Sequence, residues 1–210
     1  MRIAIIGTGN VGSAIARGLK GKGHAVTLGA REPSEPGISA LSAETGATAA
    51  LPQTAAQGAD VVILALPWAV AEEAVGALGD LSGKTVIDCM NPLRMVDGAL
   101  GLTVGHTTSG AEIVARWLPG AHVVKTLNQV GAEIMADNAR LPHRPVMFMA
   151  GDSDAAKAQV TTILTDLGFA PLDAGGLAKA RLLEPFGMVW INQALLRGKG
   201  RSWAFAAVEG

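Results

Sequence analysis

The chain has 210 residues, 49% of them hydrophobic, which is enough for one sizeable core, and its 17 basic and 18 acidic residues are scattered, with a formal net charge of -1. This balance argues against a nucleic-acid-binding surface, and the only cysteine, Cys89, excludes an internal disulfide. The four histidines lie too far apart in sequence to predict a metal site. The longest apolar run, residues 61–70, is broken by Pro67 and is far shorter than the ~20 residues of a membrane-spanning helix, so we expect a soluble, cytoplasmic protein without a membrane partner.

Short apolar runs alternate with helix-like segments along the chain, a pattern typical of a parallel sheet covered by helices on both faces. Strands are expected near 2–6, 24–29, 47–49, 60–66, 84–88, 121–125, 145–150 and 169–173, and helices near 10–21, 38–45, 52–58, 69–79, 109–118, 130–137, 153–167 and 176–197. We therefore predict an α/β fold with a Rossmann-type, doubly wound, mostly parallel sheet and a long C-terminal helix. Because no linker divides the sequence, we expect one domain over 1–210, with a core at 1–125 and a C-terminal extension of sheet and helix at 126–210.

A glycine-rich turn follows the first predicted strand. Residues 7–12, Gly7-Thr8-Gly9-Asn10-Val11-Gly12, match the pattern G-x-G-x-x-G, and the residues behind them are helix-like. Such a turn uses its first glycine for a tight bend, its second for close approach to a pyrophosphate and its third for packing helix on strand. The strand, turn and helix together predict a dinucleotide site over residues 7–12; the alternative is a glycine-rich turn without a ligand.

The end of the second predicted strand decides which dinucleotide binds. NAD enzymes place an acidic residue there for the ribose 2′-hydroxyl, and NADP enzymes use an arginine near the 2′-phosphate. Here no carboxylate ends the strand, and Arg31 follows Ala30, so we predict NADP as the cofactor, with Ser34 as a further hydroxyl donor. The alternative is a solvated Arg31 that pairs with Glu32 or Glu35.

Ligands of open α/β sheets bind beyond the carboxyl ends of the strands, where the strand order reverses. The residues that follow the later strands are therefore cleft candidates: Leu66, Pro67, Trp68, Asn91, Pro92, Asn128 and Gln129. Trp68 is expected either to wall a nicotinamide pocket or to belong to the core. Asn91 and Asn128 either bind a carboxamide or a ring edge, or serve as turn residues.

Several segments resemble the coenzyme F420-dependent NADP oxidoreductases, in which NADPH and an 8-hydroxy-5-deazaflavin exchange a hydride. The resemblance covers nearly the whole chain and is carried by residues 6–12, 29–31, 66–68, 109–115, 171–177 and 180–184. Residues 124–128 are also similar to the cytosolic domain of the STEAP ferric reductases, which use a flavin. The resemblance implies NADP as cofactor and coenzyme F420, or FMN or FAD, as the small-molecule redox acceptor. Two residues depart from the family pattern. Relatives often have a phosphate-binding serine at the position of Ala30, and deazaflavin enzymes can carry a histidine at the position of Asn128.

No nucleophile with an adjacent base is evident in the sequence. Hydride transfer between two ring cofactors does not require one, because the protein then supplies orientation and excludes water. We therefore predict no catalytic side chain, with Lys179 on the surface and Cys89 in the core. An alternative is a dehydrogenase or reductase of a small carbonyl or imine, which would need a proton donor such as Lys179 or His106. A further alternative is a non-enzymatic protein that senses NADPH.

The last helix and the tail behind it suggest contacts beyond the sheet. Apolar residues of that helix cover more than one face, and Arg181 and Glu184 are expected to pair because they lie three residues apart. Trp203 and Phe205 in the tail would form an unusual apolar patch if exposed, which predicts a homodimer. In the family that the chain resembles, a comparable tail lies near the acceptor and the dimer contact.

Overall fold

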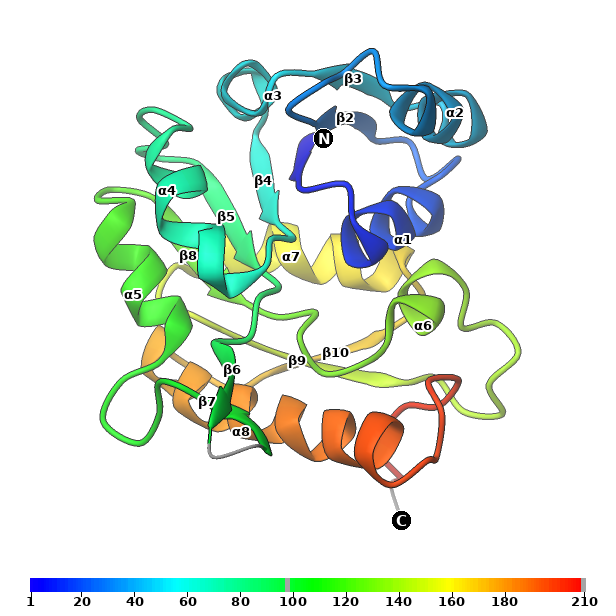
Figure 1. Ribbon diagram of the computed structural model, residues 1–210, viewed down its shortest axis with the longest axis vertical. Coiled ribbons are helices and arrows are strands. Elements are labelled where there is room, and N and C mark those ends of the chain that lie inside the picture. Colours follow the sequence, from blue (N-terminus) through cyan, green and yellow to red (C-terminus); the bar gives the residue numbers. More distant parts are fainter. Residues whose placement is uncertain (97–98, 209–210) are drawn as a thin grey trace.

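The computed structural model describes residues 1–96 and 99–208 (Figure 1). Its centre is an eight-stranded sheet in the order β10-β9-β8-β5-β4-β1-β2-β3. The strands are β1 (Arg2–Ile6), β2 (Ala25–Gly29), β3 (Thr48–Ala50), β4 (Val61–Leu64), β5 (Thr85–Asp88), β8 (His122–Lys125), β9 (Val146–Gly151) and β10 (Ala170–Asp173). Neighbouring strands are parallel except β8 and β9, which confirms the predicted mostly parallel sheet and all eight predicted strands.

The strand order reverses beside β1. From β1 the chain proceeds outward through β2 and β3 on one side, and then returns to place β4, β5 and β8 on the other. The carboxyl ends of β1 and β4 therefore flank the switch point, where α/β sheets bind ligands. Apart from the exposed Arg2 at the start of β1, both strands are continuous apolar runs, as expected where helices cover both faces of the sheet.

The helices are α1 (Asn10–Gly18), α2 (Pro36–Thr45), α3 (Pro52–Gly58), α4 (Ala71–Gly76), α5 (Gly110–Trp117), α6 (Ala132–Ala136), α7 (Asp154–Asp166) and α8 (Ala180–Ile191), with one-turn segments η1 (Trp68–Val70), η2 (Leu177–Lys179) and η3 (Asn192–Leu196). Proline begins α2 and α3, and the side chains of Ser109 and Ser153 cap α5 and α7. Alternate residues of β1 point to opposite faces: Ile3 and Ile5 pack with α1, α6 and α7, while Ala4 and Ile6 pack with α3, α4 and α5.

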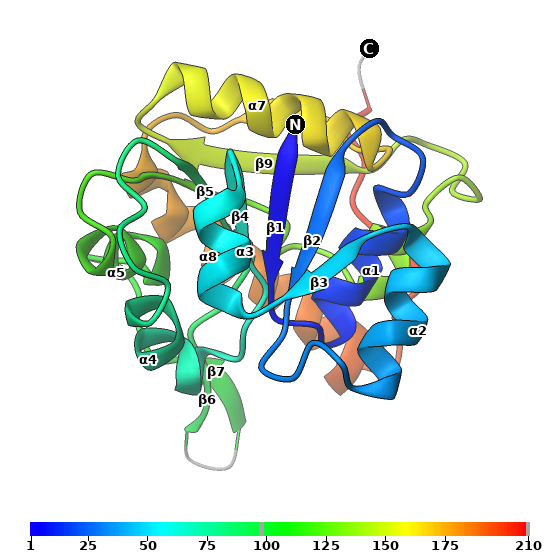
Figure 2. The same cartoon turned by 90° about the horizontal axis from the view of Figure 1, so that it is seen from above.

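The far edge of the sheet is built differently from the centre. Strands β9 and β10 lie between α7 and α8 (Figure 1), and β9 runs across the direction of β1 and β2 when the molecule is seen from above (Figure 2). The predicted C-terminal helix is confirmed over residues 177–196, but it consists of the one-turn η2, the regular α8 and a π-helical end, η3. Within the described parts of the chain, no helix is both long and apolar enough to cross a bilayer.

A hairpin that the sequence did not predict follows β5. Its strands β6 (Leu93–Val96) and β7 (Ala99–Leu102) are antiparallel, with Leu93 opposite Leu102. Leu93 and Leu100 pack against the buried residues Trp190 and Ile191 of α8. Each strand is only four residues long, and the partner that supports it lies about ninety positions later, so the local pattern carried no signal for it.

The tail aromatics Trp203 and Phe205 are packed and half-buried, so they do not form the exposed apolar patch on which the sequence-based dimer prediction was conditional. Trp203 stacks on Trp190 with ring centroids 5.8 Å apart, and Phe205 lies 4.6 Å from Phe186. The indole Nε1 of Trp190 donates to the carbonyl of Trp203 at 2.9 Å, and the Val146 amide donates to Phe205. The tail thus folds back on α8 of its own chain, because that helix offers aromatic partners that are invisible in the tail sequence.

Candidate active site

The glycine turn after β1 has the conformation that its sequence predicts. Gly7 has a positive φ of 101°, and a Cβ there would overlap the carbonyl oxygen of Ala65. A Cβ at Gly12 would overlap the Gly7 carbonyl, so α1 packs on the turn only because residue 12 has no side chain. At Gly9 no atom lies within 4 Å of the corresponding position. The first and third glycines are therefore required by contacts within the protein, while the absence of a side chain at the second leaves open space above the turn.

The end of α1 at this turn is suited to an anion. Gly9 precedes the helix and no side chain caps it. The first N–H groups of a helix have no partner within the helix and carry partial positive charge. The Ser13 hydroxyl donates to the Thr8 carbonyl at 2.9 Å and so ties the turn to the helix. Asn10 is exposed and Val11 is half-buried at the rim of the turn. The geometry fits a pyrophosphate.

The loop after β2 lies beside this turn. The Gly7 amide donates to the Gly29 carbonyl, and the amide of the buried Ala30 donates to Ala50 at 3.0 Å. Arg31 and Ser34 are exposed. None of the ion pairs formed between described residues involves Arg31, so the alternative pairing with a neighbouring glutamate is absent from that part of the chain.

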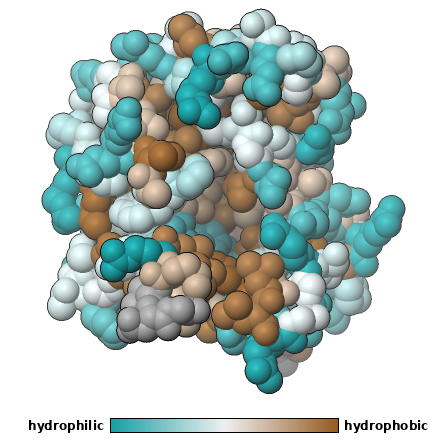
Figure 3. Space-filling view, viewed as in Figure 1, coloured by the Kyte–Doolittle hydropathy of each residue, from teal (hydrophilic) through white to brown (hydrophobic). Residues whose placement is uncertain are grey.

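The molecule is hollowed over the carboxyl ends of β1 and β4 (Figure 3). Leu66 follows β4 and approaches the glycine turn, since its Cδ2 is 3.1 Å from a Cβ built at Gly7. Pro67 is exposed, and Trp68 is half-buried and stacks on Trp117 with centroids 5.4 Å apart. Trp68 therefore packs against α5, as a core residue would, and it also lies beyond the end of β4, where a residue that lines a nicotinamide pocket is expected.

The amides of Asn91, Asn128 and Gln129 form one network behind this hollow. Asn91 Nδ2 donates to the Asn128 carbonyl at 3.0 Å, and Asn128 Nδ2 donates to Asn91 Oδ1 at 2.9 Å and to the carbonyl of Leu183 at 2.9 Å. Gln129 Nε2 donates to Asn128 Oδ1 and to the Phe148 carbonyl. Both amide hydrogens of Asn128 are therefore used inside the protein, where they join the loops after β5 and β8 to α8. Pro92, next to Asn91, is buried.

A cluster of three buried charges lies beneath this network, and the sequence did not predict it. Asp88 and Lys125 are the last residues of β5 and β8 and are paired in register, and Glu184 comes from α8. Lys125 Nζ lies 3.0 Å from Asp88 Oδ2 and 3.2 Å from Glu184 Oε1, and it also donates to the Met90 carbonyl. All three side chains are at most 1% exposed. The only sequence signal was a lysine and an aspartate at the ends of two apolar strands.

Each member of this buried charge cluster has its hydrogen-bonding groups satisfied. Burial alone would lower the pKa of Lys125, but the two carboxylates outweigh it and the pKa is raised. The oxygens of Glu184 accept the amides of Gly110 and Ala111, the first residues of α5, at 2.9 and 3.1 Å. Asp88 Oδ1 accepts the Met90 amide at 2.9 Å. The cluster thus connects the turn after β5 with α5 and α8.

The predicted pair of Arg181 and Glu184 is wrong. Glu184 turns inward to the cluster, and Arg181 instead makes a bidentate contact with Glu112 of α5, at 2.9 and 2.6 Å. This hydrogen bonding, opposed by partial burial and helped by Ser109, lowers the pKa of Glu112. Two successive turns of α8 are therefore bound to α5, one by a buried carboxylate and one by a surface ion pair.

Of the residues weighed for other chemistry, Cys89 and Lys179 have the predicted environments. Cys89 is buried, and burial raises the pKa of its thiol, so it is a core residue and not a nucleophile. Lys179 is exposed, as predicted, and so is His106, which has a positive φ of 58°. Neither has a described ion-pair partner. Among the described residues no group of three or more His, Cys, Asp or Glu side chains is arranged to hold a metal ion.

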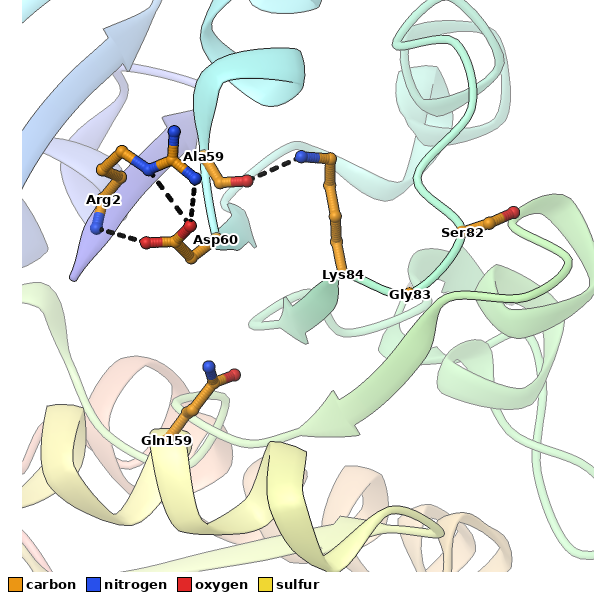
Figure 4. Close-up of a pocket in the computed structure, with 7 residues that line it drawn as sticks. All are labelled: Arg2, Ala59, Asp60, Ser82, Gly83, Lys84 and Gln159. Atoms are coloured by element: carbon orange, nitrogen blue, oxygen red, sulfur yellow. Dashed lines mark hydrogen bonds and ion pairs between the residues drawn. The ribbon is translucent and has the colours of Figure 1, made fainter.

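A second hollow of about 400 Å³ lies at the opposite, amino ends of the strands (Figure 4). Its charged side chains already have partners within the protein. Arg2 pairs with Asp60, and Lys84 Nζ donates to the Ala59 carbonyl at 2.7 Å. Ligands of this fold class bind at the carboxyl ends, and no unpaired charged group faces this hollow from the residues that line it. We therefore place the functional site at the glycine turn.

Comparison with known proteins identifies the family to which the chain belongs. The family model described as NADP oxidoreductase, coenzyme F420-dependent, matches residues 2–92, which include the glycine turn and the ends of β2, β4 and β5. Rat metalloreductase STEAP3 is 28% identical over 183 residues, which are 87% of this chain but 36% of that protein. Human metalloreductase STEAP2 is 30% identical over 104 residues, half of this chain and 19% of that protein. The chain thus spans about a third or less of the length of these relatives.

Solved structures match most or all of the chain. A candidate F420-dependent NADP reductase from Arthrobacter sp. FB24 has a TM-score of 0.89 and 34% identity, with all of both chains covered. A hypothetical protein from Sinorhizobium meliloti has a TM-score of 0.73 and 32% identity over 86% of this chain and 88% of that one. A reductive aminase from Aspergillus terreus, at 19% identity and a TM-score of 0.68 over 94% of this chain and 62% of that one, shares the fold. On these matches the chain belongs to the family of coenzyme F420-dependent NADP oxidoreductases.

Proposed function

We propose that this NADP-dependent oxidoreductase transfers hydride between NADP(H) and a deazaflavin of the F420 type, or a flavin such as FMN or FAD. The observation that carries the proposal is the uncapped end of α1 above the open space at Gly9, at the switch point of the sheet. Family membership supports the nicotinamide cofactor, and the family description supports the deazaflavin.

The cofactor would lie along the carboxyl ends of the strands. In this arrangement residues 7–12 hold the pyrophosphate, and Ala30, Arg31 and Ser34 surround the adenosine 2′-phosphate. The nicotinamide then extends over β4, β5 and β8, toward Leu66, Pro67, Trp68, Asn91, Pro92 and Asn128. Since the amide hydrogens of Asn128 are already used, we infer that this residue acts by holding Asn91 and the loop after β5.

The chemistry itself belongs to the bound groups. NADPH would give a hydride to the ring of the acceptor, which also takes up one proton from water, and NADP⁺ and the reduced acceptor result. The chain needs to bring the two rings together and exclude water, and no side chain has to form a bond or carry the proton. Trp68, Pro92 and the paired amides would border the two rings and hold the shape of the cleft.

Replacing Arg31 with alanine is expected to weaken NADPH binding by roughly one to two orders of magnitude and to leave NADH binding nearly unchanged. Charge-assisted hydrogen bonds to a phosphate contribute about 1.5–3 kcal/mol, and NADH lacks the 2′-phosphate. Both dinucleotides would be titrated into the wild type and the variant. Equal losses for the two, or a wild type that prefers NADH, would show that this loop does not select NADP.

The acceptor is tested by anaerobic oxidation of NADPH against F420, FMN, FAD, a quinone and a ferric chelate. We expect rapid oxidation with F420 or with a free flavin. Turnover with F420 alone would exclude a flavin-dependent, STEAP-like reaction, and turnover with flavins alone would exclude the deazaflavin. Tight NADPH binding with no turnover of any acceptor would contradict the proposal and favour an NADPH sensor.

We also propose that the protein is a homodimer that forms through an exposed apolar stripe on α8 and η3. Leu182, Val189 and Leu196 are spaced seven residues apart and are 64%, 50% and 56% exposed, and Met95 of the hairpin is 61% exposed. Hydrophobic side chains gather over α8 and the neighbouring hairpin (Figure 3). A second copy of the chain would cover such a stripe. Gel filtration should give a dimer at micromolar concentration and a monomer for Val189→Glu; a monomeric wild type would contradict this.

A further inference from the structure

The buried charge cluster of Asp88, Lys125 and Glu184 lies at the nicotinamide side of the cleft. Asp88 and Lys125 end β5 and β8, the strands that follow β4 away from the switch point. In a fold of this class the adenosine half of the dinucleotide lies on the β2 side, and the nicotinamide half extends to the other side. With NADP(H) bound in this way, the cluster would lie beneath the half of the cofactor that changes its charge during the reaction.

The hydrogen bonds of the cluster indicate that both carboxylates are ionised. Glu184 faces two backbone amides and the Lys125 ammonium, and Asp88 faces the Met90 amide and the same ammonium. Every contact to their oxygens comes from a donor, so a protonated carboxyl would find no acceptor. Two negative charges and one positive charge leave a net single negative charge in the interior. The partial positive charge at the start of α5 offsets only part of it.

The cluster is also in contact with the residues that border the cleft. Lys125 donates to the carbonyl of Met90 and Asp88 accepts the amide of Met90, the residue immediately before Asn91. Glu184 holds Gly110, and a Cβ at that glycine would lie 3.3 Å from Trp68 and 3.4 Å from Pro92. At these positions the cluster is joined to the border of the cleft by direct protein contacts, and protein screens charge weakly compared with bulk solvent.

We propose that the net negative charge of this cluster makes the site bind the oxidised, cationic nicotinamide in preference to the reduced, neutral one, and so favours hydride donation from NADPH. The inference rests on the proposed function, because it requires NADP(H) in this cleft. The protein can tune a bound redox cofactor through charges placed near its ring, and a field needs no contact with the reacting atoms. Asp88 and Glu184 would act electrostatically, while Lys125 keeps both of them ionised in the interior.

The test is the ratio of two dissociation constants, for NADPH and for NADP⁺, in the wild type and in Glu184→Gln. Neutralising one carboxylate should lower the ratio Kd(NADPH)/Kd(NADP⁺) by about three- to tenfold, the range for one elementary charge acting over roughly 10–15 Å at an effective dielectric constant of about 20 with salt screening. A fivefold change corresponds to about 20 mV in the potential of the bound couple. The two ligands differ only at the ring, so a general disturbance of the cleft cancels in the ratio.

Two further variants complete the experiment. Asp88→Asn removes the other buried carboxylate and should shift the ratio in the same direction, which keeps the inference testable if Glu184→Gln does not fold. Glu133→Gln makes the same chemical change at a glutamate that is 49% exposed and paired with Arg201, and it should leave the ratio unchanged. Equal changes of both constants in the cluster variants would overturn the inference and reduce the cluster to a structural role. A wild type that binds neither dinucleotide would instead overturn the proposed function.

Discussion

Replacing Gly9 with alanine is expected to leave the fold intact and to weaken NADPH binding by roughly 100-fold or more. The backbone of Gly9 has φ -72°, which alanine adopts freely, and no protein atom lies within 4 Å of the added methyl group. The methyl would instead occupy the space over which a pyrophosphate approaches the end of α1. Loss of two charge-assisted hydrogen bonds from the backbone to phosphate corresponds to an effect of this size. The measurement is NADPH titration together with urea unfolding.

The matched variant is Gly12→Ala, only three residues further along the chain. Its methyl group would overlap the Gly7 carbonyl, so α1 would have to move away from the turn. We expect this variant to lose stability as well as binding, by about 1–3 kcal/mol or more, as overpacked sites do. Wild-type affinity for NADPH in Gly9→Ala would contradict the placement of the pyrophosphate at this turn.

Replacing Lys125 with alanine is expected to destabilise the protein by about 3–5 kcal/mol, the usual cost of removing one partner from a buried ionic group. Two buried carboxylates would be left without their shared ammonium, and the Met90 carbonyl would lose its donor. Because the stability of a domain is commonly 5–15 kcal/mol, a substantial fraction would be lost. Urea unfolding followed by circular dichroism measures the change.

The control for this variant is Lys157→Ala on α7. Lys157 also contacts two carboxylates, those of Asp154 and Asp173, but the first is 98% exposed and the second 45%. Solvent screens such pairs, and the loss of stability should be much smaller than for Lys125→Ala. Equal effects of the two substitutions would show that the buried charge cluster does not stabilise the fold.

The features that the sequence by itself determined are those with local causes. The glycine turn is one, because Gly7 and Gly12 meet backbone demands set within a few residues of each. The positions of the central strands β1, β4 and β5 are another, since a strand that is buried on both faces is a short apolar run. The position of Arg31 also has a local cause, because its distance along the chain from the glycine turn brings it to the end of β2. The cofactor class, NADP, could therefore be inferred before any contact was known.

Only the tertiary structure decided the partners of the charged and amide side chains. Lys125 and Asp88 are 37 residues apart, and Glu184 meets Gly110 across 74 residues. Helical spacing favoured a pair between Arg181 and Glu184. In the fold, the carboxylate of Glu184 is buried and binds an ammonium and two backbone amides instead, and Arg181 pairs with Glu112. The hairpin after β5 and the packing of Trp203 on Trp190 depend on α8 in the same way. The periodicity of apolar residues indicates which face of a helix or strand is buried. The partner of a buried polar group depends on how the helices and strands pack, because such a group forms its hydrogen bonds with whichever donors and acceptors the fold brings near it.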